Sequence, residues 1–304
     1  MAADAARVTE GSRRGALRAL SRFAWRRPWL RGLGQISLPV LAFLVVYVAA
    51  LVALLIQSFW TTDSFTGKIV HDWSLDNFRA LRDAPYPRIV LRTVGIAAAV
   101  TLTCAALAVP YAYFLVRVAS RRLRVALLVA TTLPLWVSYL VRVYSWRLIL
   151  NPDGALNWFL NGLGLPDLNI AYTNWALWLV FTYIWLPFMV LPVYAALERI
   201  PGSLLEASGD LGARGWTTFR RVTLPLAVPG IAAGSIFTFA LTLGDYIAPA
   251  LVGGPGSQLI GNVVFDNIGL ANNAPFAAAF ACVPLAIMAV YLAVMKRLGA
   301  FESL

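Results

Sequence analysis

Charged residues are scarce in this chain. Only 13% of its 304 residues are Asp, Glu, Lys or Arg, whereas about a quarter are charged in a typical soluble domain. The mean hydropathy is correspondingly high, at +0.72. This composition excludes an ordinary soluble domain and favours a protein whose solvent is the lipid bilayer.

Histidine, cysteine and lysine are almost missing. A single histidine, His71, cannot build a metal site of several histidines, which excludes an intramembrane metalloprotease. Cys104 and Cys282 lie in apolar runs, where we expect them to pack as small apolar side chains. Neither lysine, Lys68 or Lys296, lies in the Gly-x-x-x-x-Gly-Lys-Ser/Thr pattern of a phosphate-binding loop. We therefore expect no ATP hydrolysis by this chain.

Long apolar runs, in contrast, are abundant. A helix needs about 20 apolar residues, with a range of about 17–25, to cross about 30 Å of hydrocarbon, and six strongly apolar runs without a charged residue fall in or above that range. We predict an all-α membrane protein with spans at roughly 37–58, 93–116, 125–146, 174–196, 229–250 and 275–296. The third and fifth spans each take in one charge near the outer end, Arg142 and Asp245.

The basic residues are unevenly distributed over the predicted loops. Eighteen of the 25 Lys and Arg residues fall on one side of the six spans, and the positive-inside rule places that side, with both termini, in the cytoplasm. The net charge of +11 then requires no nucleic acid partner. We expect residues 1–35 to form a basic tail on anionic lipid and residues 36–304 to form the transmembrane domain. A cleaved signal peptide is the alternative, but the apolar run after Arg31 is too long for one.

A polar, glycine-spaced segment separates the fourth and fifth predicted spans, on the expected cytoplasmic side. It reads EASGDLGARGWTTFRRVTLP, from Glu206 to Pro225. Ser203 is placed to cap a helix with Glu206 in its first turn, and Gly212 can end that helix. A second short helix is expected from about 216 to 222, ending before Pro225. On physical grounds this hairpin is either an amphipathic anchor to lipid headgroups or a docking surface for a cytoplasmic partner.

The same segment resembles the EAA loop of permease subunits of bacterial ABC importers. That loop has the pattern Glu-Ala-Ala, three residues, Gly, nine residues, Ile, one residue and Leu-Pro, and this chain keeps every spacing, with Ser208 and Val222 as conservative departures. The resemblance implies the type I (MetI-like) importer fold and a loop, here about 197–228, whose coupling helix sits in a cleft of a separate ATP-hydrolysing subunit. The residues that it assigns to this contact are Glu206, Ala207, Ser208, Asp210, Gly212 and Arg214.

Other stretches resemble the polyamine (spermidine/putrescine) branch of these importers. They are LDNFRAL at Leu75–Leu81, VRVYSWRLILNPDGALNWFLNGLG at Val141–Gly164 and LGDYIAPALVGGPGSQLIGNVV at Leu243–Val264. The resemblance covers most of the chain from about residue 36 onward, and permeases for other small organic solutes or ferric iron share parts of it.

The resemblance also implies the partners. One six-span chain would form half of a translocation pathway in the bacterial inner membrane, beside a second permease that is a related but different chain. Two copies of a cytoplasmic ATP-binding subunit would hold ATP and Mg²⁺, an external binding protein would deliver the substrate, and this chain would carry no cofactor. Alternatives of another class are an ATP-independent secondary transporter or channel, or a membrane-anchored interaction scaffold.

Asp245 is the acidic residue that a predicted span takes in. Counting from Pro229, it lies about 24 Å along the fifth span, where a carboxylate facing lipid costs up to about 3 kcal/mol. We therefore expect it to face a cavity or a partner. A carboxylate flanked by aromatic rings suits a flexible polycation, which makes candidates for substrate contact of Asp245, Tyr246, Trp136, Tyr139, Phe181 and Trp185. Alternatively, Asp245 caps a broken helix or pairs with Arg142, and the aromatic residues serve in packing or in an interface belt.

Overall fold

The computed structural model describes residues 28–63 and 66–297, without the side chains of residues 28–36 and 38. Most of the predicted basic tail therefore lies outside the described residues. The chain divides into two compact units, with the boundary between Ile56 and Gln57. The described part of the first unit is helical throughout and belongs to α2 (Pro28–Gln57), whose last residue is assigned to the second unit. Its stretch Pro39–Gln57 is long and apolar enough to cross a membrane, as predicted for the first span.

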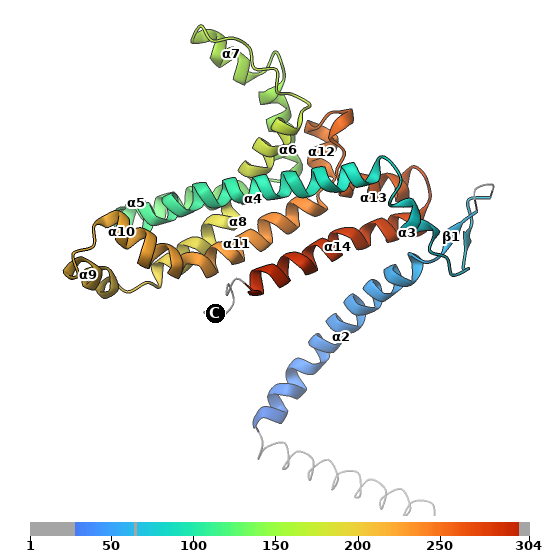
Figure 1. The fold of residues 1–304 in the computed structure, drawn as a ribbon, viewed down its shortest axis with the longest axis horizontal. Helices are drawn as coiled ribbons and strands as arrows, with labels where there is room; N and C mark the ends of the chain where they lie inside the picture. The colour runs from blue at the N-terminus through green and yellow to red at the C-terminus, as the bar shows by residue number, and fades with distance from the viewer. Residues whose placement is uncertain (1–27, 64–65, 298–304) are drawn as a thin grey trace, which may run out of the picture. The chain divides into compact units, whose positions relative to one another are not determined.

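The core of the second unit is built from three long helices, α4 (Tyr86–Arg117), α8 (Asn174–Glu198) and α11 (Leu224–Gly244), which run side by side (Figure 1). Buried apolar side chains of α4 and α8 form the largest hydrophobic cluster, together with a few from α6, α11 and α12. These helices confirm the second and fourth predicted spans and most of the fifth.

Glycine sets how closely α8 and α11 approach. A Cβ atom at Gly230 would lie 2.5 Å from the Cβ atom of Ala196 and 2.6 Å from the carbonyl oxygen of Pro192. At Gly234 it would lie 2.6 Å from the sulfur atom of Met189. Small residues that let two backbones come together are typical of helix packing in membranes, where dispersion contacts replace the hydrophobic effect.

The sixth predicted span is the helix α14 (Ala274–Arg297). It contacts α11, where the ring of Tyr291 stacks on that of Phe239 with 4.5 Å between centroids. The hydroxyl group of Tyr291 donates a hydrogen bond of 2.8 Å to the Oγ atom of Ser235. Aromatic stacking and a hydroxyl pair thus join the last helix to the core of the unit.

The span predicted at 125–146 is not one continuous helix. The structure has α5 (Arg121–Thr132), a 3-10 turn η1 (Leu133–Trp136) and then α6 (Tyr139–Leu150). The part before residue 137 and the part after residue 138 meet at 96°. Val137 and Ser138 are extended, with ψ angles of 138° and 137°. Pro134 lies at the start of the 3-10 turn, where its missing N–H and fixed φ favour a break over a continuous α-helix.

The fifth predicted span is also shorter at its C-terminal end than expected. Helix α11 ends at Gly244, and Asp245 is extended, with a ψ angle of 131°. The residues that follow form a separate helix, α12 (Ile247–Val252), then a 3-10 turn η3 (Pro255–Ser257) and α13 (Ile260–Gly269). Among the described residues there are five helices long and apolar enough to span a membrane, or six if the bent pair is one span.

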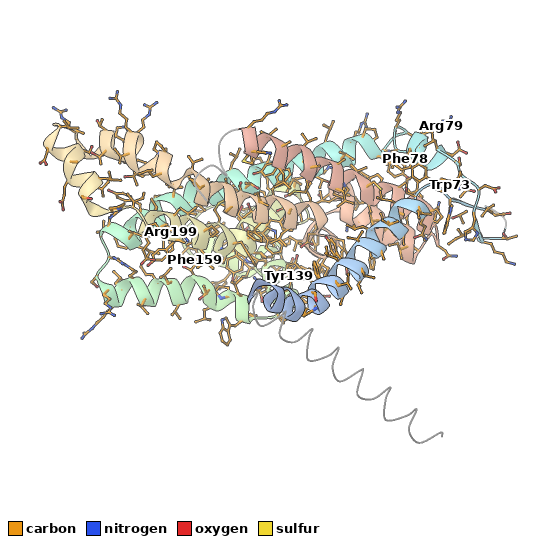
Figure 2. The ribbon with its side chains drawn as sticks, turned by 90° about the horizontal axis from the view of Figure 1, so that it is seen from below. Trp73, Phe78, Arg79, Tyr139, Phe159 and Arg199 are labelled. Carbon is orange, nitrogen blue, oxygen red and sulfur yellow. The ribbon has the colours of Figure 1, made fainter. Side chains whose placement is uncertain are left out.

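The loops on the two ends of the second unit differ in character. One end carries the short helices α9 (Gly202–Asp210) and α10 (Gly215–Thr218), and Arg199 lies toward it. The opposite end carries the two-stranded sheet β1 (Thr61–Thr62) and β2 (Ile69–Val70) and the helix α3 (Asp76–Ala80), with Trp73, Phe78 and Arg79 (Figure 2). A further short helix is α7 (Ala155–Gly162).

The close approach of α8 and α11 gives a first test. The substitution Gly230→Ala should destabilise the folded chain by about 1–3 kcal/mol, because the added methyl group meets backbone atoms that cannot move aside. Gly95→Ala on α4 is the matched control, since a Cβ atom there meets nothing within 4 Å. The measurement is the midpoint of thermal unfolding in detergent. An equal midpoint for both variants would show that the helices do not meet at Gly230.

Candidate functional site

The segment predicted to face a cytoplasmic partner folds as a helical hairpin. We call residues 197–228 the coupling segment. Helix α9 is followed by a turn at Gly212, whose φ angle of +79° is in the left-handed region that favours glycine. The N–H group of Ala213 donates to the carbonyl oxygen of Ser208 at 3.0 Å. The Oγ atom of Ser208 is 2.9 Å from the Oγ1 atom of Thr218, which joins α9 to α10. The predicted role of Gly212 in ending the first helix is confirmed.

Two local predictions about α9 are wrong. The helix begins at Gly202 with Pro201 as its N-cap, and no side chain, including that of Ser203, caps it. Pro201 fixes the start because its φ of −62° leads directly into the helix. Glu206 therefore lies beyond the first turn, where the helix dipole acts less strongly on its carboxylate.

The second helix of the segment does not end before Pro225. Helix α10 continues through a π-helical turn, η2 (Phe219–Thr223), into α11 without interruption. Pro225 lies in the first turn of α11. A π-turn pairs residues five apart and is a common way for a helix to absorb a local irregularity, so the missing N–H of proline does not stop the helix here.

The surface of the coupling segment is mostly solvent-exposed. Of the residues predicted for the ATPase contact, Ser208 is half-buried and the exposed ones are Glu206, Ala207, Asp210, Gly212 and Arg214. The structure adds two large apolar residues that the sequence pattern does not single out, Leu211 at 89% exposure and Trp216 at 70%. Exposed apolar side chains rimmed by charges are typical of a docking surface.

A cavity of about 730 Å³ lies beside the coupling segment. One wall is the face of α4 with Val109 and Tyr113, and the other includes Trp216 and Phe219. The rings of Tyr113 and Phe219 meet edge to face, with 5.4 Å between centroids. The π-turn is therefore in direct aromatic contact with a core helix.

Asp245 joins three pieces of the chain at the end of α11. Its Oδ1 atom accepts hydrogen bonds from the N–H groups of Ile247 at 2.8 Å and Ala248 at 2.9 Å, which caps the start of α12. Its Oδ2 atom accepts a hydrogen bond from the hydroxyl group of Tyr139 on α6. Within the described ranges it forms no ion pair with Arg142, so the geometry matches the alternative in which Asp245 caps a broken helix.

The neighbouring helix α13 supports this break. The side-chain amide of Asn262 donates to the carbonyl oxygen of Tyr246 at 2.8 Å and accepts from the N–H group of Leu259 at 3.1 Å. A Cβ atom at Gly261 would lie 2.6 Å from the carbonyl oxygen of Asp245. Asn262 was not predicted, because an amide within a glycine-rich loop carries no periodic signal. It satisfies backbone groups that would otherwise be unpaired in an apolar setting.

Four of the six predicted substrate-contact residues come together, and two lie apart. The ring of Tyr139 stacks on that of Trp185, with 5.9 Å between centroids, and Trp185 on that of Phe181 at 6.4 Å. Trp136 is 91% exposed, because the break at residues 137 and 138 removes the helical spacing that would have paired it with Tyr139. Tyr246 stacks instead on Phe265 of α13, at 4.6 Å.

The guanidinium group of Arg142 lies over the ring of Tyr139, with its central carbon 5.8 Å from the centroid. This aromatic surface therefore already has a cation near it, in keeping with the affinity of such rings for positive charge. Phe181 is fully buried, which matches a packing role for its side chain. Trp185 is also buried, at 7% exposure, whereas Asp245 and Tyr139 are partly exposed.

Comparisons by sequence and by structure both match this chain to components of transport systems. Residues 105–300 match the family model described as "Binding-protein-dependent transport system inner membrane component". The chain is 48% identical over 313 residues to the inner membrane ABC transporter permease protein YdcU of Escherichia coli (strain K12), covering 98% of this chain and 99% of the relative. It is 33% identical over 260 residues to the spermidine/putrescine transport system permease protein PotB of the same strain, covering 85% and 94%.

A solved structure with a similar fold is a chain of a bacterial alginate ABC transporter in complex with an alginate-bound periplasmic protein. The TM-score is 0.72, with 20% identity over 90% of this chain and 96% of that one. At this identity the match concerns the fold, and it confirms the predicted importer-permease architecture.

The junction at Asp245 gives a second test. Asp245→Ala removes three hydrogen bonds to a carboxylate and should destabilise the chain by at least about 1.5–3 kcal/mol. Asp245→Asn keeps an oxygen that can cap α12 and should destabilise it less. The measurement is thermal unfolding in detergent, with Asp153→Ala in an exposed loop as the control. The junction role fails if Asp245→Ala unfolds at the same temperature as that control.

Proposed function

This chain belongs to the family of binding-protein-dependent transport system inner membrane components, and we propose that it is the permease for polyamines within that family. It is a multi-pass subunit of an ABC importer in the bacterial inner membrane. Its own role is transport and not catalysis. Spermidine and putrescine are the cargo that we propose, with ATP hydrolysed by a separate subunit.

The proposed contact with the ATP-hydrolysing subunit is the hairpin of α9 and α10. The observation that carries this proposal is its surface, where the exposed charged residues Glu206, Asp210 and Arg214 occur in the same short hairpin as the exposed apolar side chains of Leu211 and Trp216. Charge around an apolar centre suits a specific protein contact better than lipid headgroups, because acids are repelled by anionic lipid. The turn at Gly212 fixes the angle at which the two short helices present these side chains.

A complete transporter requires further chains. We propose two copies of the ATP-binding subunit, each engaging one permease, and a second permease that is related to this chain but different from it. An external binding protein would deliver the substrate to the end that carries β1, β2 and α3. The solved alginate transporter, which is in complex with a periplasmic protein, supports this arrangement. Closure of the ATP-binding subunits would move the coupling segment and switch the helices between outward and inward access.

Polyamine is the cargo that relatives and chemistry favour together. PotB, at 33% identity, is named for spermidine and putrescine. In this chain the carboxylate of Asp245 lies beside the stacked rings of Tyr139 and Trp185. Its oxygens already accept three hydrogen bonds within the chain, and a carboxylate has about four acceptor positions. Asp245 therefore keeps one acceptor position that could receive a hydrogen bond from an ammonium group.

The coupling proposal is tested on the hairpin. Glu206→Lys reverses one charge of the surface, and Gly212→Pro prevents the φ of +79° on which the turn depends. Both should leave membrane insertion normal and lower ATP-dependent uptake and the amount of ATP-binding subunit that co-purifies. Gly209→Ala on α9, where a Cβ atom meets nothing within 4 Å, is the control. Unchanged uptake in both test variants would remove the docking role.

The cargo is tested by uptake of radiolabelled putrescine and spermidine into cells that carry the complete transporter. Asp245→Asn should raise the half-saturating concentration about tenfold or more, because a charged hydrogen bond contributes about 1.5–3 kcal/mol. Asp153→Asn should not change it. If excess polyamine does not compete with the transported solute, another small organic solute or ferric iron is the cargo. Uptake by this chain without ATP would instead indicate a secondary transporter or channel.

A further inference from the structure

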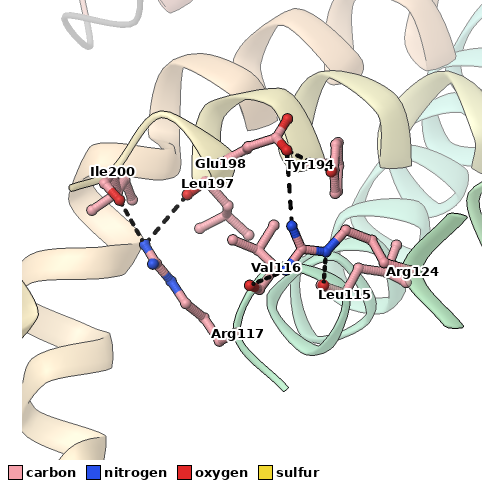
Figure 3. A network of polar contacts seen from close by, with 8 residues as sticks. All are labelled: Leu115, Val116, Arg117, Arg124, Tyr194, Leu197, Glu198 and Ile200. Carbon is pink, nitrogen blue, oxygen red and sulfur yellow. Dashed lines mark hydrogen bonds and ion pairs between the residues drawn. The ribbon is translucent and has the colours of Figure 1, made fainter. Parts of the chain in front are cut away.

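Two arginine side chains close the ends of helices next to the coupling segment. Arg117, the last residue of α4, reaches the end of α8, where its Nη2 atom donates to the carbonyl oxygens of Ile200 at 2.9 Å and Leu197 at 3.4 Å (Figure 3). The last carbonyl groups of a helix have no partner within it, and the helix dipole favours a cation at that end. Arg117 supplies both the donor and the charge.

Arg124, in the first turn of α5, does the same for the end of α4. Its Nε and Nη2 atoms donate to the carbonyl oxygens of Leu115 at 2.7 Å and Val116 at 2.9 Å. Its Nη1 atom lies 4.0 Å from the Oε1 atom of Glu198 on α8, which also accepts a hydrogen bond of 2.8 Å from Tyr194 (Figure 3). The two arginines thus join the ends of α4, α5 and α8, and we call them the arginine bracket.

The arginine bracket holds the chain just before α9. We call Ile200 and Pro201 the root of α9. Ile200, whose carbonyl oxygen Arg117 holds, directly precedes Pro201, the N-cap of α9. The same residues border a cavity of about 360 Å³, lined by Pro201 and Leu204 together with Pro229 and Gly230 of α11. The root is therefore fastened to α4 by hydrogen bonds, while space remains between it and α11.

We propose that Arg117 and Arg124 are positioning residues that pass the displacement of the coupling segment to α4 and α5. This rests on the proposed coupling role of the segment. A guanidinium group donates in fixed directions from a planar fork, so its carbonyl partners move with it. Through Arg117 the root of α9 moves with α4. Through Arg124 the end of α4 moves with α5, the helix that leads to Tyr139 and the cluster at Asp245.

The test separates coupling from simple stabilisation. The assembled transporter is purified through a tag on this chain and placed in proteoliposomes, where solute uptake and ATP hydrolysis are measured on the same sample. Arg117→Met should lower uptake per ATP hydrolysed about tenfold, within the usual range of coupling factors, while hydrolysis continues. Arg117→Lys, which keeps the charge but not the fork, should give an intermediate ratio.

Arg122→Met is the matched control, because Arg122 is exposed on the same short helix as Arg124. It removes the same charge and should leave uptake per ATP unchanged. If Arg117→Met does not assemble, Arg124→Gln decides by the same ratio. The proposal is overturned if the ratio is unchanged, if uptake and hydrolysis fall equally, or if neither variant assembles, since the bracket would then serve stability alone.

Glu206→Lys in the same assay distinguishes this inference from the proposed function. Normal uptake and normal retention of the ATP-binding subunit in Glu206→Lys would mean that the coupling role itself fails. A defect in Glu206→Lys with an unchanged ratio in Arg117→Met would leave the coupling role standing and reject only the bracket.

Discussion

The structure depends on one constraint, which is that backbone N–H and C=O groups inside a membrane must find partners within the protein. A continuous helix meets it along its length, so the sensitive places are the ends and breaks of helices. At the break after Gly244, Asp245 and Asn262 supply the missing partners. At the ends of α4 and α8, Arg124 and Arg117 supply them. These four polar side chains all bond to backbone groups at helix ends or breaks.

Most of the helices could be predicted from the sequence, because a run without charge reports directly that its residues suit hydrocarbon. α8 and α14 match their predicted ranges within two residues. The run between Arg124 and Arg142 was equally apolar, and yet it bends by 96° near residue 137. Composition indicates whether a segment suits hydrocarbon, but not whether its helix is straight or bent. Pro134 does not decide this either, because Pro187 and Pro192 lie inside α8, which is unbroken.

The candidate sites were predictable to different degrees. The turn at Gly212 follows from local chemistry, because glycine is the residue best suited to its positive φ angle. The contact between Tyr139 and Asp245 joins residues 106 positions apart, and no local pattern encodes it. Arg117 and Arg124 were visible in the sequence only as part of a basic side. Their carbonyl partners on other helices arise from tertiary packing, and so does the exposure of Leu211 and Trp216.

The uninterrupted helix from Gly215 to Gly244 has a consequence for how the two candidate sites are related. It contains 30 residues, α10, the π-turn and α11 together, and at about 1.5 Å per residue it is a rod of about 45 Å. The hairpin turn of the coupling segment leads into one end of this rod, and Asp245 follows directly on the other. One continuous helix therefore connects the two candidate sites. A rotation of this helix at Trp216 would also rotate its other end, which directly precedes Asp245, and no loop lies between them.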